Sequence, residues 1–263
     1  MLLPLAEVYV LNIIRVKFIR SDEIKYISHL DIMRTFSRAI RRSRIPIDYS
    51  KGFNPQPQMV FGLPLAVGVT SEAEYADFQL TDYVAPDDFV RLLNGELPTG
   101  LKIVKAAYNY SKNNIMSAVD MASYKIRVRV SEVTKNRGIT VDDIKHKLEL
   151  FTKMDNITVL KENKKKGEKS YIDIKPMIHN ISVEEDSNGE YSKAGIFIIS
   201  ALLRAGGRAN LKPDLLVEAI NSNMNIDFEI GHIHRTGLFV TKNGKIYEPL
   251  DPQVLSENKV AGR

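Results

Sequence analysis

The order of hydrophobic periodicities along the chain constrains its fold more than any single motif does. Apolar residues that alternate with polar ones predict a half-buried strand, whereas apolar residues three and four positions apart predict an amphipathic helix. In the first half these patterns predict strand, helix, strand, strand, helix and strand, in that order, at Ile14 to Arg20, Ser28 to Ile45, Met59 to Val69, Glu72 to Leu80, Asp87 to Leu93 and Leu101 to Tyr108.

The second half repeats the order, with negligible sequence identity to the first. Its elements are predicted at Tyr124 to Val130, Thr140 to Met154, Ile157 to Leu160, Tyr171 to Val183, Ile196 to Leu203, Pro213 to Asn221 and Phe228 to Val240, with a solvated hairpin tip at Lys161 to Ser170. A β-α-β-β-α-β order is that of ferredoxin-like folds. We therefore predict an α+β protein of two tandem ferredoxin-like (βαββαβ) units, residues 13–110 and 122–245, joined by a polar linker between Asn109 and Ala122.

Length and composition exclude several classes of protein. A chain of 263 residues with 44% hydrophobic content suits one large domain or two ordinary ones. The absence of cysteine excludes disulfides, thiolate catalysis and cysteine-held metal clusters within the chain, and it is compatible with a cytoplasmic protein. Met1 to Val10 is apolar, but it contains Glu7 and is too short to span a bilayer, so we expect an extension and no membrane partner.

Positive charge concentrates in the first predicted helix and the loop that follows it. The whole chain has a formal charge of +5, whereas Ile13 to Phe53 holds ten Lys or Arg against four Asp or Glu, or +6. The basic residues of this patch include Arg34, Arg38, Arg41 and Arg42 in the helix and Lys51, beside Gly52, in the loop. Cations near a helix C-terminus are favoured by the helix dipole, so solvated surface is one interpretation. Binding of a polyanion, RNA in particular, is the other.

Two further regions are candidates for binding an anion. The first predicted strand of each half carries basic residues at its polar positions, Arg15 and Lys17 in one and Arg127 and Arg129 in the other. In a ferredoxin-like unit both helices cover one sheet face, so we expect these residues on the open face, either as ordinary solvent-facing positions or as contacts to RNA. The second region is a glycine-rich loop with Arg204, Gly206, Gly207 and Arg208, whose N–H groups would cradle a phosphate while the arginines neutralise it.

His29 is the candidate catalytic residue. It lies in the first turn of the basic helix, which Ser28 is predicted to cap and whose apolar stripe is predicted at Leu30, Met33, Phe36 and Ile40. We expect the loop from Lys51 to Pro55 to return beside His29. A helix N-terminus favours neutral imidazole, so His29 would act as a general base, whereas a packing or capping role is the alternative. Candidate loop or partner contacts are Tyr26, Ser28, Phe53, Asn54, Glu72 and Glu74.

The sequence holds little sign of a cofactor or metal. GxxxxGK[ST], GxGxxG, nucleophile-elbow and HExxH patterns are absent, so we expect no cofactor. His232 and His234 would project from one strand face, but no third ligand is indicated. We therefore expect no metal site.

A set of short motifs runs along the basic helix, its loop and the segments that follow. The motifs are Tyr26-Ile-Ser28-His29-Leu30-Asp31, Arg34, Arg38-Ala39, Arg41-Arg42, Pro46, Ser50-Lys-Gly52-Phe53-Asn54-Pro55-Gln-Pro57, Leu63-Pro64-Leu65, Gly68-Val-Thr-Ser71-Glu72, Glu74 and Arg235-Thr236 with Leu238. In these motifs the chain resembles the radical-SAM-linked protein family, a bacterial domain of unknown function. The resemblance is specific from about Ile13 to Gly100 and looser afterwards. Gln56 is a departure, because the family pattern has a histidine there.

The resemblance implies a partner and a pathway. In that family the domain is encoded beside, or fused behind, a radical SAM protein with a cobalamin-binding-type domain. The likeness therefore implies partnership with a radical SAM protein and an RNA-related pathway, and it supplies no reaction. The tandem arrangement also resembles CRISPR repeat-processing endoribonucleases, which have two ferredoxin-like halves, a late glycine-rich loop and often a histidine near the first helix.

Together these observations predict an RNA-binding or substrate-presenting accessory protein that acts with a radical SAM enzyme in RNA modification or processing. We expect no catalytic activity from the chain on its own. Two alternatives stay open. One is a metal-independent endoribonuclease with His29 as general base, and the other is a purely protein-binding module whose arginines dock an acidic partner surface.

Overall fold

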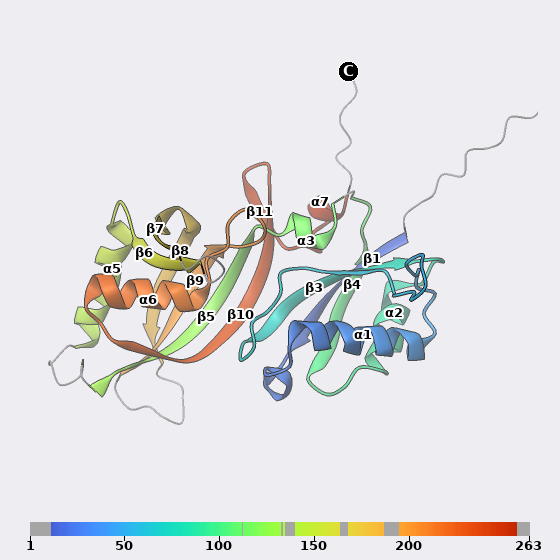
Figure 1. Ribbon diagram of the computed structural model, residues 1–263, viewed down its shortest axis with the longest axis horizontal. Helices are drawn as coiled ribbons and strands as arrows, with labels where there is room; N and C mark the ends of the chain where they lie inside the picture. Colours follow the sequence, from blue (N-terminus) through green and yellow to red (C-terminus); the bar gives the residue numbers. More distant parts are fainter. Residues whose placement is uncertain are drawn as a thin grey trace, which may run out of the picture.

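One large, mostly antiparallel sheet runs through the protein and makes it a mixed α+β fold (Figure 1). The computed structural model describes residues 12–111, 113–132, 134, 140–163, 168–186 and 195–256. The extension expected over Met1 to Val10 lies outside these residues. Within them, no helix is both long enough and apolar enough to cross a membrane.

The first half forms one end of the sheet. Its elements are β1 (Asn12–Arg20), the 3-10 turn η1 (Asp22–Ile24), α1 (His29–Ser43), β2 (Met59–Phe61), β3 (Thr70–Leu80), α2 (Pro86–Asn94) and β4 (Leu101–Tyr108). Strand β1 lies between β3 and β4 and pairs antiparallel with both, while β2 pairs antiparallel with β3. Both helices lie on one sheet face, where Phe36 of α1 and Phe89 of α2 pack on Phe78.

The second half continues the sheet. Its elements are α3 (Ile115–Ala118), β5 (Met121–Val130), α5 (Val141–Lys153), β6 (Thr158–Asn163), β7 (Glu168–Asp173), the 3-10 turn η2 (Lys175–Met177), β8 (Ile178–Glu185), β9 (Ile196–Arg204), α6 (Pro213–Met224), β10 (Phe228–Lys242), β11 (Lys245–Tyr247) and α7 (Pro252–Leu255). Strand β5 lies between β9 and β10. Strands β6 and β7 pair antiparallel and form a separate two-stranded sheet. Of the predicted hairpin tip, residues 161–163 and 168–170 belong to these strands, and residues 164–167 lie outside the described part.

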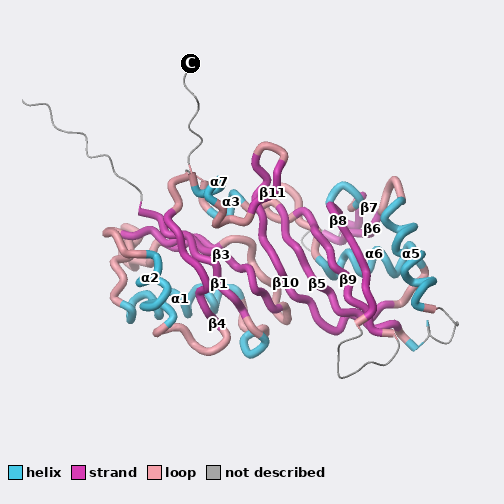
Figure 2. Tube along the Cα trace, turned by 180° about the vertical axis from the view of Figure 1, so that it is seen from behind, coloured by secondary structure: helices cyan, strands magenta, loops and turns pink. Residues whose placement is uncertain are grey.

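The two halves meet where β3 and β10 pair in parallel (Figure 2). Arg235 of β10 is buried at this junction and donates from Nη1 to the Glu74 carboxylate at 2.8 Å. Its Nη2 donates to the Tyr124 hydroxyl at 3.3 Å, so one guanidinium joins β3, β5 and β10. Glu74 is therefore an internal ion-pair partner, and the expectation that it contacts a partner molecule at the surface is wrong.

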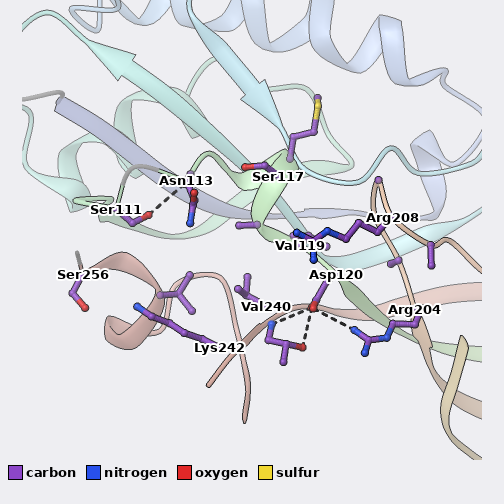
Figure 3. Close-up of a pocket in the computed structure, with 17 residues that line it drawn as sticks. Ser111, Asn113, Ser117, Val119, Asp120, Arg204, Arg208, Val240, Lys242 and Ser256 are labelled. Carbon is purple, nitrogen blue, oxygen red and sulfur yellow. Dashed lines mark hydrogen bonds and ion pairs between the residues drawn. The ribbon is translucent and has the colours of Figure 1, made fainter. Parts of the chain in front are cut away.

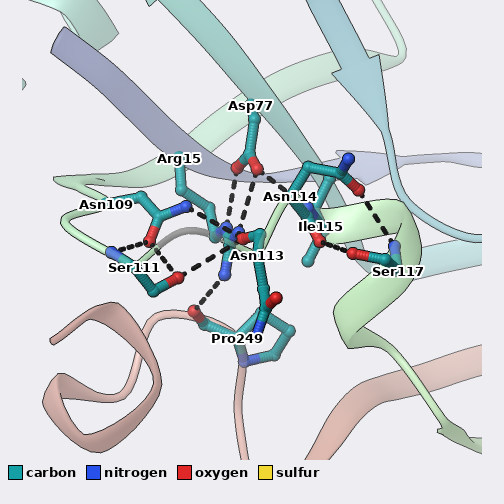
Figure 4. A network of polar contacts seen from close by, with 9 residues as sticks. All are labelled: Arg15, Asp77, Asn109, Ser111, Asn113, Asn114, Ile115, Ser117 and Pro249. Atoms are coloured by element: carbon teal, nitrogen blue, oxygen red, sulfur yellow. Dashed lines mark hydrogen bonds and ion pairs between the residues drawn. The ribbon is translucent and has the colours of Figure 1, made fainter. Parts of the chain in front are cut away.

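The polar face of β1 is covered, which corrects the expectation that Arg15 lies on an open face. Arg15 is fully buried and donates from Nε and Nη2 to the two carboxylate oxygens of Asp77, at 2.7 and 2.9 Å (Figure 4). Residues 109–120, predicted as a linker, pack here, because the Ile115 N–H donates to Asp77 and the Asn113 carbonyl accepts from Arg15. Lys17, on the same face, is partly buried and pairs with Glu248 at 3.5 Å.

The buried stripe of α1 differs from the predicted one at its first residue. Ser28 caps the helix by accepting a hydrogen bond from the Asp31 N–H, as its position predicts. The buried residues of α1 are Ile32, Phe36, Ala39 and Ile40. Leu30 is 55% exposed instead of buried, because the stripe that meets the sheet begins at Ile32.

We expect Arg15→Met to destabilise the protein strongly. The substitution leaves the Asp77 carboxylate buried without its cation, which should lower the free energy of unfolding by about 3–5 kcal/mol. Arg34→Met is the control, because Arg34 pairs with Asp31 at 3.0 Å but its side chain is 60% exposed, and its loss should cost roughly 1 kcal/mol or less. Urea unfolding followed by circular dichroism measures both, and equal losses would show that burial of the Arg15 pair is unimportant.

Glu74→Gln should also destabilise the protein, through the junction. The Glu74 carboxylate lies near two buried guanidinium groups, those of Arg20 and Arg235, so its neutralisation leaves uncompensated charge and should cost about 3–5 kcal/mol. Glu72→Gln is the matched control, since the Glu72 side chain is 58% exposed and its loss should cost about 1 kcal/mol or less. Thermal unfolding compares the two variants. A Glu74→Gln protein as stable as Glu72→Gln would argue against an electrostatic junction.

Candidate functional site

A hollow of about 800 Å³ lies between α3, the glycine-rich loop after β9, the end of β10 and the segment around α7 (Figure 3). We call it the glycine-loop pocket, and its lining residues are 111, 113, 116–120, 204, 205, 207–209, 240–242, 254 and 256. Four segments far apart in the sequence thus meet at one place. The pocket is the candidate functional site.

The glycine-rich loop is shaped by close packing on one side and is open on the other. Gly206 has φ +95°, and a Cβ there would lie 2.4 Å from the Val119 carbonyl oxygen, so this position requires glycine. A Cβ on Gly207 would meet no atom within 4 Å. Within the described residues, the N–H groups of Gly206, Gly207 and Arg208 make no hydrogen bond. Of these three residues, Gly207 and Arg208 line the pocket.

The charges of the pocket wall are three cations and one carboxylate. The carboxylate of Asp120 accepts hydrogen bonds from the Thr241 N–H at 3.0 Å and from the Arg204 guanidinium at 3.4 Å (Figure 3). Lys242 donates to the Gln253 carbonyl at 2.5 Å, and this hydrogen bond holds its ammonium group in the pocket wall. Arg208 is exposed and makes no hydrogen bond or ion pair with a described residue. The wall thus has an excess of positive charge.

The side chains of the pocket suit anion binding better than proton transfer. Arginine guanidinium groups and free backbone N–H groups are strong donors to phosphate oxygens. The described lining residues include no histidine, and their one carboxylate is already held by Thr241 and Arg204. A bound phosphate would meet donors on the loop and on β10, but no group placed to act as a general base.

The arginines of α1 do not reach this pocket. Phe78 of β3 packs on Phe36 of α1, whereas its neighbour Asp77 accepts from Ile115 of α3. Because successive strand residues face opposite sides, α1 and α3 lie on opposite faces of the sheet. The basic helix and the glycine-rich loop, two of the predicted anion-binding regions, therefore do not form one groove.

Half of the predicted arginines on α1 are engaged in ion pairs. Arg34 pairs with Asp31 at 3.0 Å, and Arg42 donates to the Glu96 carboxylate at 2.7 Å. Arg38 and Arg41 are exposed and make no hydrogen bond or ion pair within the described residues. The basic row is thus an exposed surface with part of its charge compensated.

The structure does not bring the predicted loop residues beside His29. Its ring packs edge-on against Phe61, with centroids 5.8 Å apart. Burial lowers the pKa of His29, while the charge of Glu74 opposes this shift and the two buried arginines nearby add to it. The lowered pKa favours the neutral ring, which agrees with the base predicted from sequence and equally with a packing residue.

The loop with Lys51 lies at the other end of α1 from His29. Ile47 bridges to Leu80, and the Asp48 N–H donates to Gln79, so the loop is fixed at the far end of β3. A helix of 15 residues is about 22 Å long at 1.5 Å per residue. The expectation that residues 51–55, with Gly52, Phe53 and Asn54, return beside His29 is wrong, because the chain leaves α1 at its opposite end.

The two predicted arginines of β5 are paired as well. Arg127 contacts Asp186 at 2.8 Å, and Arg129 pairs with Glu229. On the neighbouring strand the rings of His232 and His234 both bond the Thr70 hydroxyl, at 2.8 and 2.7 Å. Glu72 lies 3.7 Å from His234. Among the described residues no group of three or more His, Cys, Asp or Glu could hold a metal ion.

Sequence reasoning found one wall of the pocket and missed the others. It singled out the glycine-rich loop, but not Asp120, Thr241 or Lys242. The position of Lys242 could have been predicted from the next two residues, because the dipeptide Asn243-Gly244 is typical of a hairpin turn. In the structure both residues have positive φ and form the turn between β10 and β11. That dipeptide would have ended β10 at Lys242 and placed this lysine at a hairpin base. No local signal brings α3 to the same place.

Comparisons with known proteins identify a family and a related fold. Residues 14–213 match the model of the family described as "Uncharacterized protein conserved in bacteria (DUF2344)". No curated protein sequence matches the chain. A chain of the "Crystal Structure of a Cbf5-Nop10-Gar1 Complex" is similar with a TM-score of 0.50 and 9% identity, over 85% of this chain and 49% of that one. The "Crystal Structure of an Unknown Protein from Galdieria sulphuraria" has a TM-score of 0.22 and 11% identity, over 83% and 96%.

The likeness to the Cbf5-Nop10-Gar1 chain concerns the fold alone, and the present chain spans about half of that chain's length. The family match extends from β1 to the start of α6 and so covers most of the sequence. It confirms the expectation of a bacterial domain whose function is unknown. The chain belongs to the family of uncharacterized proteins conserved in bacteria, DUF2344.

Proposed function

We propose that this protein is an RNA-binding accessory protein that holds an RNA backbone in the glycine-loop pocket for a radical SAM enzyme, without catalysing a reaction itself. The observation that carries the proposal is the excess of positive charge around an 800 Å³ hollow whose one carboxylate is already bonded. Phosphate contacts supply most of the affinity of proteins for nucleic acids, and arginine and backbone N–H groups are their usual donors.

The position of the cations favours a polymer over a single small anion. Arg208 lies in the loop after β9, whereas Lys242 lies at the end of β10. Donors on separate segments suit successive phosphates of a backbone better than one phosphate group. The described residues of the wall include no histidine, and their one carboxylate is already bonded, which supports binding without catalysis.

A second function, docking of a protein partner, is favoured by a different surface. Tyr26, Ile27 and Leu30 are exposed at the start of α1. Leu30 continues at helical spacing into Arg34, Arg38 and Arg41, so apolar and basic side chains share one face. We call these six residues the α1 docking surface. Such a surface suits a partner that presents apolar side chains next to carboxylates.

We infer that the radical SAM protein is that partner. The resemblance of the first half to the radical-SAM-linked family supports the assignment, and much of that resemblance lies in α1 and its flanking residues. Docking through α1 would leave the pocket accessible, since α1 and α3 lie on opposite faces of β3.

We also interpret each half as a ferredoxin-like unit. In the first half the sheet order is β4-β1-β3-β2, and in the second it is β10-β5-β9-β8. Numbered within each half, both orders are 4-1-3-2, with antiparallel neighbours. This shared order supports a tandem arrangement with the β6–β7 hairpin as an insertion in the second unit.

The RNA-binding proposal predicts a salt-dependent affinity that depends on the pocket. Arg208→Gln combined with Lys242→Gln should weaken binding of a single-stranded RNA at least about tenfold, because two charge-assisted contacts are lost. The slope of log affinity against log salt should fall by about 1.4, at roughly 0.7 per phosphate contact on a single strand. Fluorescence anisotropy across a salt series measures both quantities.

The double variant Arg38→Gln with Arg41→Gln is the matched control for this experiment, because both side chains are exposed arginines outside the pocket. It should bind RNA as the wild type does. Loss of binding in this variant alone would move the RNA site to α1 and overturn the assignment to the pocket. Absence of any binding by the wild type at low salt would remove the RNA proposal.

The docking proposal predicts that Leu30→Glu weakens a complex with the cognate radical SAM protein. A carboxylate at the centre of an apolar and basic surface should be desolvated on binding and weaken the complex at least about tenfold. Leu150→Glu is the control, since Leu150 is also an exposed leucine on a helix, α5. Co-purification of the two proteins after nuclease treatment tests the contact, and a complex that survives Leu30→Glu unchanged would exclude this surface.

A further inference from the structure

Three tyrosines form a parallel stack at the end of the sheet. Tyr83 follows β3, Tyr108 ends β4 and Tyr110 lies two residues further on. The rings of Tyr83 and Tyr108 have centroids 5.3 Å apart and planes 12° apart, and those of Tyr108 and Tyr110 are 6.3 Å and 26° apart. We call these three residues the tyrosine stack.

The stack is rigid at its centre and accessible at its ends. The Tyr108 hydroxyl donates to the Val84 carbonyl and accepts from the Val84 N–H, both at 3.0 Å, which fixes the middle ring. The outer rings are largely in solvent, since Tyr83 is 66% and Tyr110 is 62% exposed. Neither outer ring is needed to close the hydrophobic core. Fixed, exposed aromatic rings are what unpaired bases stack on.

The stack adjoins the glycine-loop pocket. The Tyr110 N–H donates to the Leu255 carbonyl at 2.9 Å, and the next residue, Ser111, lines the pocket. Figure 3 shows Ser111 and Ser256 on the side of the pocket away from Arg204 and Arg208. A strand that placed a base on Tyr110 would therefore lead its backbone across the pocket toward the arginines.

Charge favours the Tyr110 end of the stack over the Tyr83 end. Asp82 precedes Tyr83, and its carboxylate accepts from the Tyr83 N–H at 2.7 Å. A phosphate backbone is repelled there, whereas beyond Tyr110 it meets the excess positive charge of the pocket. A bound single strand would therefore place its bases on the tyrosine stack and its phosphates in the glycine-loop pocket.

We propose that the tyrosine stack is a base-binding platform and that the substrate class of the glycine-loop pocket is single-stranded RNA with unpaired bases. The inference rests on the proposed function, because it extends the same site. It adds that the protein discriminates single strands from duplexes. In a duplex the bases are stacked on one another and do not reach an exposed aromatic ring.

The test compares three ligands of equal length, a single-stranded RNA, its duplex and an abasic strand with the same backbone. Wild type should bind the single strand about tenfold more tightly than the abasic strand, at roughly the strength of one stacked base. Tyr110→Leu should reduce the single-strand affinity to that of the abasic strand and leave the salt slope unchanged, since no phosphate contact is lost. The variant's binding to the abasic strand should not change.

Two variants separate stacking from a structural effect. Tyr110→Phe keeps the ring and should bind as the wild type does. Tyr171→Leu, which removes an exposed tyrosine on β7, should have no effect. Salt-dependent RNA binding that is unaffected by Tyr110→Leu, or equal for the single and abasic strands, would overturn the platform while leaving the pocket intact. Absence of RNA binding by the wild type would remove both.

Discussion

The structure depends on a buried guanidinium at the junction of its halves. Arg235 is withdrawn from water, and a charge in that position is tolerated only when it is paired and hydrogen-bonded. Its partners come from β3, β5 and the backbone at Leu63 and Pro64, so they must be assembled before the guanidinium is satisfied. This requirement fixes the register in which β3 meets β10. It joins the strands of the two halves in one continuous sheet.

A second buried pair determines where the pocket lies. Arg15 and Asp77 bind each other across β1 and β3, and their remaining hydrogen-bonding capacity is used by the Asn113 carbonyl, the Pro249 carbonyl and the Ile115 N–H (Figure 4). Those three groups belong to the segment before β5 and to the chain after β11. Both segments are thereby held on the same sheet face, where they become walls of the glycine-loop pocket. A structural ion pair in the first half thus shapes a site that opens toward the second.

The sequence predicts elements well because their causes are local. The period of apolar residues located β1, α5 and α6, and Ser28 marked the start of α1 through a contact with its own third residue. Contacts between distant segments carry no such signal. Alternation along β1 correctly assigned Arg15 to the face opposite the helices, but only the structure shows that α3 and Pro249 cover that face. The prediction that Leu30 belongs to the buried stripe of α1 was wrong for the same reason, since the position of the sheet determines which turns of the helix are covered.

Charge counts fail in a related way. A sum over Ile13 to Phe53 gives +6, yet it adds Arg15, which is neutralised inside the protein, to Arg42, which is paired with Glu96 from beyond the window. The pocket, by contrast, draws its cations from two separate stretches of sequence, with Arg204 and Arg208 at and just after the end of β9 and Lys242 at the end of β10. Electrostatic attraction depends on distance and on burial, and sequence separation measures neither. An anion-binding site is therefore better identified in the structure, by a cation without a bonding partner. Arg208 is such a cation, since the neighbouring carboxylate in the pocket wall is already bonded to other groups.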